Sequence, residues 1–369
     1  MNWRILINLK SWFGLALAVT TLAAGLPAAE FKAEPFPQYN QLFRPTNGWV
    51  GGDGAYAVTL TNDVTVWLYS DTWIGEVRGG KRRNVTMVNN SVAVQRGFDP
   101  ANAKVEFFYS TSPAGKPAAL ITPEDGKGWF WIYDGVMTPE GLFLFLMQIE
   151  KTKNSGAFGF KTTGAWLGHV SNPLAPPPQW KVTQKKILGA AFAPDEERLF
   201  GSAVLKADGF VYIYGARPSR PVGKSMLLAR VPEEKLSDFG EWRFYAKGEW
   251  SKNADDATAL GAGVANEYSV SWQPALKQYV AVYTENGLSR NIRLKTASAP
   301  AGPWSQSVVI YQCPETNKNT FCYAAKAHPT LAQSPDELVV TYVANTMNFR
   351  QVLDDARLYW PQFLRVRLR

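Results

Sequence analysis

Two aspartates occupy corresponding positions in one predicted β-hairpin of this 369-residue chain. The segment GWVGGDGAYAVTLTNDVTVWLYSDTWIG covers residues 48–75, with Asp53 at the start of one apolar run and Asp71 at the end of the next. A turn at residues 61–63 reverses the chain, so antiparallel pairing brings both carboxyl groups to the same end of the hairpin. The pair predicts an acid–base site; the alternative is that both aspartates only cap strand ends.

Hydrolysis of a glycosidic bond requires two such groups. One carboxyl group protonates the leaving oxygen and the other attacks or activates water, and retaining enzymes hold the two about 5 to 5.5 Å apart. Residues opposite each other on paired strands have Cβ atoms about 4.5 to 5.5 Å apart. The hairpin therefore favours a retaining mechanism with Asp71 as nucleophile and Asp53 as acid/base, although the sequence leaves the two roles interchangeable. Repulsion between the carboxylates would raise the pKa of one of them and so supply the protonated acid.

Further polar residues lie near the ends of predicted strands. Glu267 in NEYSVSW is a third candidate catalytic carboxylate, or else a surface glutamate at a strand start. Asn89 and Asn90 follow the basic segment 81–83, and their side-chain amides would either bind sugar hydroxyls or cap the backbone. Lys326 and His328 in AKAHPTL would orient a sugar, and a structural role for His328 is the alternative.

Aromatic residues flank the two aspartates. Trp49 and Trp73 are candidates for stacking on a sugar ring, although a chain with 14 Trp must bury most of them in its core. Of the two histidines, His169 in WLGHVSNP is expected to be structural.

The composition predicts an all-β fold. Aromatic residues reach 13%, and 30 Gly and 24 Pro interrupt short β-rich runs, while long helical periodicity is absent. A small-residue run followed by a hairpin recurs five times, and these groups begin near Gly51, Trp129, Gly201, Glu267 and Ala325. Five starts predict a five-bladed β-propeller, with residues 36–369 as a single domain. The C-terminal WPQFLRVRLR is expected to pair beside the N-terminal segment and close the ring.

The phrase ASAPAGPW resembles the small-residue turn before Gly-Pro-Trp in propellers of sugar enzymes, and three further phrases carry a resemblance to a known family: GGDGAY, LYSDTWIG and MVNNSVAV. They resemble the exported bacterial family called domain of unknown function 4185, part of which is glycoside hydrolase family 183, the endo-D-arabinanases. The resemblance implies a five-bladed propeller with its two catalytic aspartates, here Asp53 and Asp71, in the first blade. It also implies a furanose-containing, arabinan-like polysaccharide as substrate, or a sister family with another substrate.

The N-terminus predicts export. Residues 1–29 contain Arg4 and Lys10, an apolar stretch and the small-residue sequence LPAA, which together are typical of a cleaved signal peptide. An uncleaved anchor is the alternative, but the stretch is short for a membrane span. Cleavage would reduce the net charge from +8 to +6, and the basic residues form no stripe suited to nucleic acid. We therefore expect a periplasmic or secreted protein with no stable membrane insertion, no nucleic-acid partner and a polysaccharide or oligosaccharide substrate.

Cys313 and Cys322 are the two cysteines, and in an exported protein their spacing predicts a disulfide across a polar loop. Zinc is disfavoured because a site would need more Cys or His nearby. No cofactor is expected, since dinucleotide, phosphate-loop, GxSxG and HExxH motifs are missing. The alternative to an enzyme is a non-catalytic propeller that binds carbohydrate or acts as an envelope scaffold.

Overall fold

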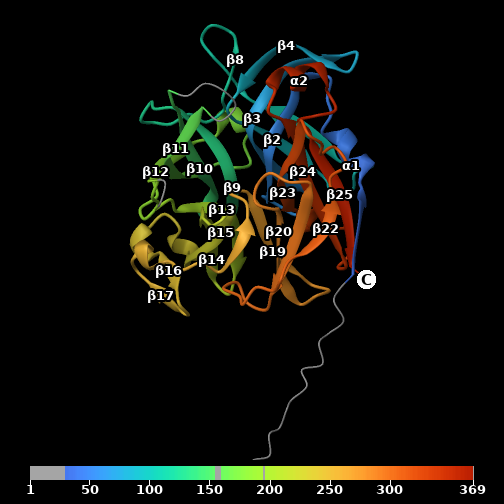
Figure 1. Cartoon of the computed structure of the whole chain (residues 1–369). Coiled ribbons are helices and arrows are strands. Elements are labelled where there is room, and N and C mark those ends of the chain that lie inside the picture. The colour runs from blue at the N-terminus through green and yellow to red at the C-terminus, as the bar shows by residue number, and fades with distance from the viewer. Residues whose placement is uncertain (1–29, 154–158, 194–195, 369) are drawn as a thin grey trace, which may run out of the picture.

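Five β-sheets are arranged around a central axis in the computed structural model, which describes residues 30–153, 159–193 and 196–368 (Figure 1). The predicted five-bladed β-propeller is confirmed. The predicted signal peptide, residues 1–29, lies outside the described residues. Within the described part of the chain, no helix is long and apolar enough to span a bilayer.

Each blade begins with an inner strand next to the axis. The inner strands are β2 (Asn47–Thr59), β9 (Trp129–Thr138), β13 (Leu199–Ala207), β19 (Tyr268–Gln273) and β23 (Thr320–Ala327). Each inner strand contacts the next, and β23 contacts β2, so the inner strands form a closed ring. These strands lie at or beside the five repeat starts expected from the sequence.

The outer strands follow in chain order. The first blade adds β3 (Val64–Arg78), β4 (Lys81–Val88), β5 (Ser91–Arg96) and β6 (Lys104–Phe108), and a small ribbon pairs β7 (Ser110–Thr111) with β8 (Pro117–Ala118). The second adds β10 (Gly141–Lys151), β11 (Phe160–Val170) and β12 (Val182–Lys186). The third adds β14 (Phe210–Pro218), β15 (Lys224–Pro232), β16 (Arg243–Ala246), β17 (Glu249–Ser251) and β18 (Gly261–Val264). The fourth adds β20 (Gln278–Thr284), β21 (Asn291–Ala297) and β22 (Val308–Gln312).

The fifth blade is built from both ends of the chain. Its strands after β23 are β24 (Glu337–Thr346), β25 (Pro361–Leu368) and β1 (Phe31–Pro35), and β1 pairs antiparallel with β25. This pairing confirms the expected closure of the ring by the C-terminal strand. The helices are α1 (Pro37–Leu42), α2 (Phe349–Asp354) and the 3₁₀ turns η1 (Pro177–Gln179), η2 (Glu233–Lys235), η3 (Phe239–Glu241), η4 (Ala254–Asp256) and η5 (Pro329–Leu331).

Packing of one blade against the next explains the apolar runs. The second strand of each blade is covered on both faces, so β10 has nine successive buried residues from Gly141 to Ile149 instead of an alternating pattern. Aromatic rings fill the seam where the ring closes: Phe43 lies 4.8 Å from Trp67 and 4.9 Å from Phe363 between ring centroids. This contact joins the first blade to the closing strand.

Arg82 fastens a long loop to the first blade. Its side chain is buried and donates hydrogen bonds to the carbonyl oxygens of Val50, Val352 and Leu358. The last two carbonyls belong to the segment between β24 and β25, and α2 in that segment packs against β4 at the top of Figure 1. Arg82 of β4 therefore anchors the fold, because removal of its buried guanidinium would leave three carbonyl groups without a donor.

Candidate functional site

A cavity of about 430 Å³ opens at one end of the propeller axis. Residues in and next to the inner strands line it. The polar part of this lining includes all three candidate carboxylates, Asp53, Asp71 and Glu267. A second cavity of about 740 Å³, lined by the far ends of the inner strands, opens at the other end of the axis. The predicted meeting of Asp53 with Asp71 therefore occurs, and Glu267 from the fourth blade joins them.

A break in strand pairing places the two aspartates. Gly52 is opposite Thr72 and Gly54 is opposite Tyr69. Asp53, the one residue between the two glycines, is therefore opposite two residues of β3, Ser70 and Asp71. The strands continue past both aspartates, and the site is therefore a bulge within the hairpin instead of the strand end expected from the sequence. Bulges of this kind redirect side chains and often lie beside active sites.

The glycines around Asp53 make this break possible. Gly54 has φ of +81°, a conformation that a side chain would strain. Gly51 has φ of +134°, and a Cβ atom there would lie 2.5 Å from the carbonyl oxygen of Tyr359. The GGDG sequence thus lets the first blade approach the closing segment closely.

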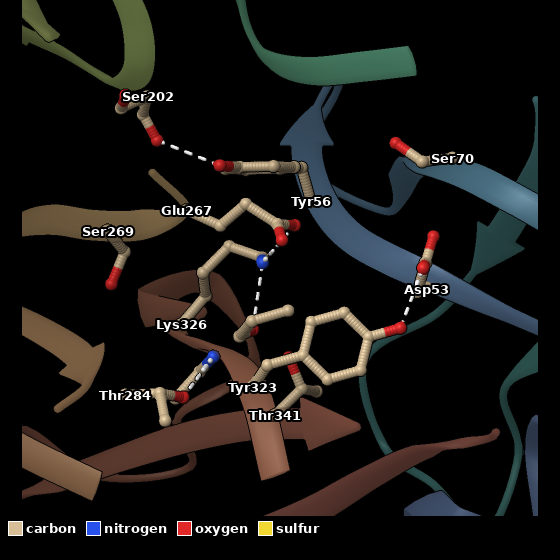
Figure 2. Close-up of polar contacts among 12 residues, drawn as sticks. Asp53, Tyr56, Ser70, Ser202, Glu267, Ser269, Thr284, Tyr323, Lys326 and Thr341 are labelled. Atoms are coloured by element: carbon tan, nitrogen blue, oxygen red, sulfur yellow. Dashed lines mark hydrogen bonds and ion pairs between the residues drawn. The ribbon is translucent and has the colours of Figure 1, made fainter. Parts of the chain in front are cut away.

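Asp53 is held by two phenols. Tyr323 and Tyr359 donate hydrogen bonds of 2.6 and 2.9 Å to its Oδ2, and Figure 2 shows the first of these. Its Oδ1 is buried and accepts no hydrogen bond from the described residues. Burial raises the pKa of Asp53 well above its usual value, and the nearby Asp71 and Glu267 raise it further. A buried oxygen without a donor favours the neutral acid, so Asp53 is suited to carry a proton.

Asp71 has a different environment. Its Oδ1 accepts hydrogen bonds from the indole of Trp131 at 2.9 Å and from the amide of Asn89 at 3.1 Å. Burial raises the pKa of Asp71 to about 6, against the lowering effect of these two donors. Asp71 is consequently the carboxyl group of the pair that ionises first, near neutral pH.

Glu267 forms an ion pair with Lys326. Lys326 Nζ lies 3.4 Å from its Oε1, and the lysine side chain is 1% exposed. Lys326 also donates to the carbonyl oxygen of Ala324 at 2.8 Å and lies 4.2 Å from the centre of the Tyr56 ring. Figure 2 shows the Glu267 and Lys326 side chains meeting near Tyr56. Burial lowers the pKa of Lys326, and the paired Glu267 opposes this effect.

The two predicted stacking tryptophans are core residues. Trp49 is 1% exposed, its ring stacks on Phe107 at 4.4 Å and its indole N–H donates to Ser91. Trp73 is 9% exposed and packs in the same cluster. Neither lines the cavity, because their strand positions direct them into the packed faces of the blade.

The two asparagines have separate roles. Asn89 binds Asp71 and positions it without lining the cavity. Asn90 is fully buried and exchanges hydrogen bonds with the backbone of Ile121 and Phe130. The capping alternative is therefore correct for Asn90, which ties the first blade to the second.

His328 and Lys326 belong to the second cavity. Burial lowers the pKa of His328 to about 3, and its Nε2 lies 2.7 Å from Thr341 Oγ1. His328 is thus a neutral structural residue, and Lys326 reaches the first site only through Glu267. The structural expectation for His169 holds, since its ring stacks on Phe143 at 4.5 Å.

The predicted disulfide is not formed in this structure. Cys313 and Cys322 are both buried free thiols. They lie within hydrogen-bonding distance of each other, and this contact raises the pKa of Cys313. Apolar residues of the fourth and fifth blades pack around both side chains, and the Thr316 hydroxyl donates a hydrogen bond to Cys322 Sγ at 3.3 Å.

Three residues of the site escaped the sequence analysis: Trp131, Tyr323 and Tyr359. Trp131 lies in the run WFWIY that begins the second inner strand, but the run does not tell which indole faces Asp71. Tyr323 and Tyr359 are 270 and 306 residues from Asp53, so only ring closure brings them there. Among the described residues, no group of three or more His, Cys, Asp or Glu is arranged to hold a metal ion.

Comparisons with known proteins agree with the fold. A family model described as "Domain of unknown function (DUF5005)" matches residues 37–368, and the resemblance to domain of unknown function 4185 is not confirmed. A Bacteroides ovatus protein described provisionally as a hydrolase is 19% identical, with a TM-score of 0.71 over 91% of this chain and 90% of its own. The catalytic domain of the Coprinopsis cinerea GH62 alpha-L-arabinofuranosidase is 11% identical, with a TM-score of 0.50 over 92% of this chain and 97% of its own. No curated protein matches the sequence.

Proposed function

The chain belongs to the DUF5005 family, and we propose that it is a glycoside hydrolase in which Asp53 and Asp71 are the catalytic pair. One observation carries the proposal: two carboxyl groups from neighbouring strands line one cavity, and burial raises the pKa of both. Acids in apolar surroundings beside a second carboxylate are the groups that protonate a glycosidic oxygen near neutral pH. The cavity volume is within the range of small-molecule sites.

The hydrogen bonds assign different catalytic roles to Asp53 and Asp71. Asp53 carries the proton and donates it to the glycosidic oxygen as the bond from that oxygen to the anomeric carbon breaks. Asp71, stabilised as a carboxylate by Trp131 and Asn89, attacks the anomeric carbon and forms a glycosyl ester. Asp53 then accepts a proton from water, the water oxygen displaces Asp71, and both groups return to their starting states. Neighbouring strands support this retaining mechanism because they hold the two groups close together.

Glu267 stabilises charge instead of donating a proton. Its carboxyl group forms an ion pair with the buried Lys326. Its negative charge raises the pKa of Asp53, so it helps to keep the acid protonated. Glu267 is therefore a positioning residue in this proposal.

The proposed substrate is a furanose-containing, arabinan-like polysaccharide. The proposed location of the protein is the periplasm or the cell exterior. The fold similarity to an arabinofuranosidase supports this choice of sugar, together with the resemblance of GGDGAY and LYSDTWIG to the endo-D-arabinanases. The signal-peptide pattern of residues 1–29 supports export.

The experiment is a screen of the purified protein against arabinans, arabinogalactans and xylans, with products separated by chromatography. We expect oligosaccharides or arabinose to be released from at least one arabinose polymer, with retention of anomeric configuration by NMR. Saturable binding of these polymers without product would instead support a carbohydrate-binding propeller.

A further inference from the structure

Three exposed apolar side chains gather at the mouth of the cavity. Leu288 is 44% exposed, Met347 50% and Phe349 39%, and all three line the cavity that contains Asp53 and Asp71. They come from the turn after β20 and from the start of the segment that carries α2. We call these three residues the apolar rim.

The apolar surface continues inward to the carboxyl groups. Phe321 and Trp131 line the same cavity, and the Trp131 indole reaches Asp71. A ligand that enters past the rim therefore meets hydrocarbon on its way to the two acids. The lining combines these apolar side chains with polar ones such as Lys224 and Asn266, so the cavity offers a ligand both hydrocarbon and hydrogen-bonding groups.

A purely polysaccharide ligand explains only part of this entrance. A sugar chain that leaves the site presents hydroxyl groups, and leucine and methionine side chains offer them no hydrogen bond. Of the three rim residues only Phe349 has a flat ring face on which a sugar can stack, whereas the branched Leu288 and the flexible Met347 have none. Exposed apolar groups that continue a binding pocket gain free energy when hydrocarbon covers them.

We propose that the site also accepts an amphiphilic glycoside, whose sugar binds at Asp53 and Asp71 and whose linear alkyl chain lies on the apolar rim. The sugar's position rests on the proposed function, whereas the chain's position rests on Leu288, Met347 and Phe349. The occupant of the rim is thus the lipid-like aglycone of a glycolipid.

The test is calorimetric titration with methyl and hexyl arabinofuranosides, and with methyl and hexyl glucopyranosides as a second pair. Full burial of one methylene strengthens binding about 4-fold, and contact on one side gives about 2-fold. The five added methylenes of the hexyl compound should therefore lower Kd by roughly 30-fold in wild type. The same ratio is expected for both sugars, because the rim contacts only the chain.

A double variant, Met347→Ser with Phe349→Ser, should reduce this ratio to about 3-fold or less. The matched control is Leu174→Ser, which removes an apolar side chain that is 64% exposed and lines other cavities. The control should keep the wild-type ratio. Equal affinity for methyl and hexyl glycosides, or a ratio unchanged in the double variant, overturns the inference.

Failure of this inference is distinguishable from failure of the proposed function. Hydrolysis of arabinose polymers with no effect of alkyl chain length would leave the enzyme and remove the lipid-like substrate. A chain-length effect abolished by the double variant, in a protein that hydrolyses no glycoside, would leave an amphiphile-binding site and remove the hydrolase.

Discussion

The hydroxyl group of Tyr359 donates a 2.9 Å hydrogen bond to Oδ2 of Asp53, across 306 residues of sequence. Tyr359 precedes the closing strand β25, and Asp53 lies in the first inner strand. The candidate acid is therefore oriented by the segment that closes the ring. The site is complete only when the segment that precedes β25 has packed against the first blade.

Substitution of either aspartate should abolish hydrolysis. Asp53→Asn should lower kcat by about 10²–10⁴-fold through loss of the general acid, and Asp71→Asn should lower it at least as much. An aryl glycoside whose leaving group needs no proton should restore bond cleavage in Asp53→Asn and leave Asp71→Asn inactive. Asp63→Asn, in the exposed turn of the same hairpin, is the control and should retain full activity. Full activity in both site variants would exclude this mechanism.

The pH dependence of kcat/KM should be bell-shaped. Asp71 must be ionised, so activity should rise as the pH increases through about 6, its raised pKa. Asp53 must be protonated, so activity should fall at higher pH as its raised pKa is passed. The two limbs report the pair as a coupled system. A profile that is flat between pH 5 and pH 9 would contradict these assignments.

The two phenols should tune the alkaline limb. Each hydrogen bond to Asp53 favours the carboxylate, so Tyr323→Phe or Tyr359→Phe should raise the pKa of Asp53 and move this limb to higher pH. Loss of orientation should also lower kcat by about 10-fold. Tyr342→Phe is the matched control, since that hydroxyl donates to Glu315 in the loop between β22 and β23. A lower kcat without a shift of the alkaline limb would show that the tyrosines have only a structural role.

Glu267→Gln should affect stability more than catalysis. The change leaves the buried Lys326 ammonium without its anion and should lower the free energy of unfolding by about 3 kcal/mol, measured by urea denaturation. Turnover should remain within about 10-fold of wild type after correction for the folded fraction. Adding Lys326→Met should restore most of the stability. A 1,000-fold loss of turnover in Glu267→Gln would instead identify Glu267 as the acid.

Asp71→Asn should stabilise the protein above neutral pH. The folded state binds the Asp71 proton more tightly than the unfolded state does, so wild type loses stability as the pH rises from about 4 through about 6. The asparagine variant avoids this loss and should be more stable by about 2 kcal/mol at pH 8, with little difference below pH 4. Thermal unfolding at the two pH values measures the effect. Equal stability at pH 8 would show that Asp71 is not strained by burial.

Much of the architecture follows from local sequence. Glycine, aromatic and β-branched residues in short recurring runs determine strands and turns, because backbone geometry and side-chain shape act over a few residues. The five blade starts and the hairpin that unites Asp53 with Asp71 were predictable for this reason. The terminal strand was predictable as well, since an unpaired edge must be covered.

The roles of single side chains were decided by packing between blades. Trp49, Trp73 and His328 have residue types suited to sugar binding, yet each is enclosed by neighbouring strands that the sequence does not identify. Conversely, Trp131, Tyr323 and Tyr359 reach the two aspartates from other blades.

The sequence by itself therefore determined the hairpin, the number of blades and the two acids. Only the tertiary structure decided which oxygen of each acid has donors, that Glu267 is paired with Lys326 and where the apolar rim lies. The physical reason is that burial and hydrogen bonding at the axis depend on contacts between blades hundreds of residues apart, whereas strand formation depends on neighbours along the chain.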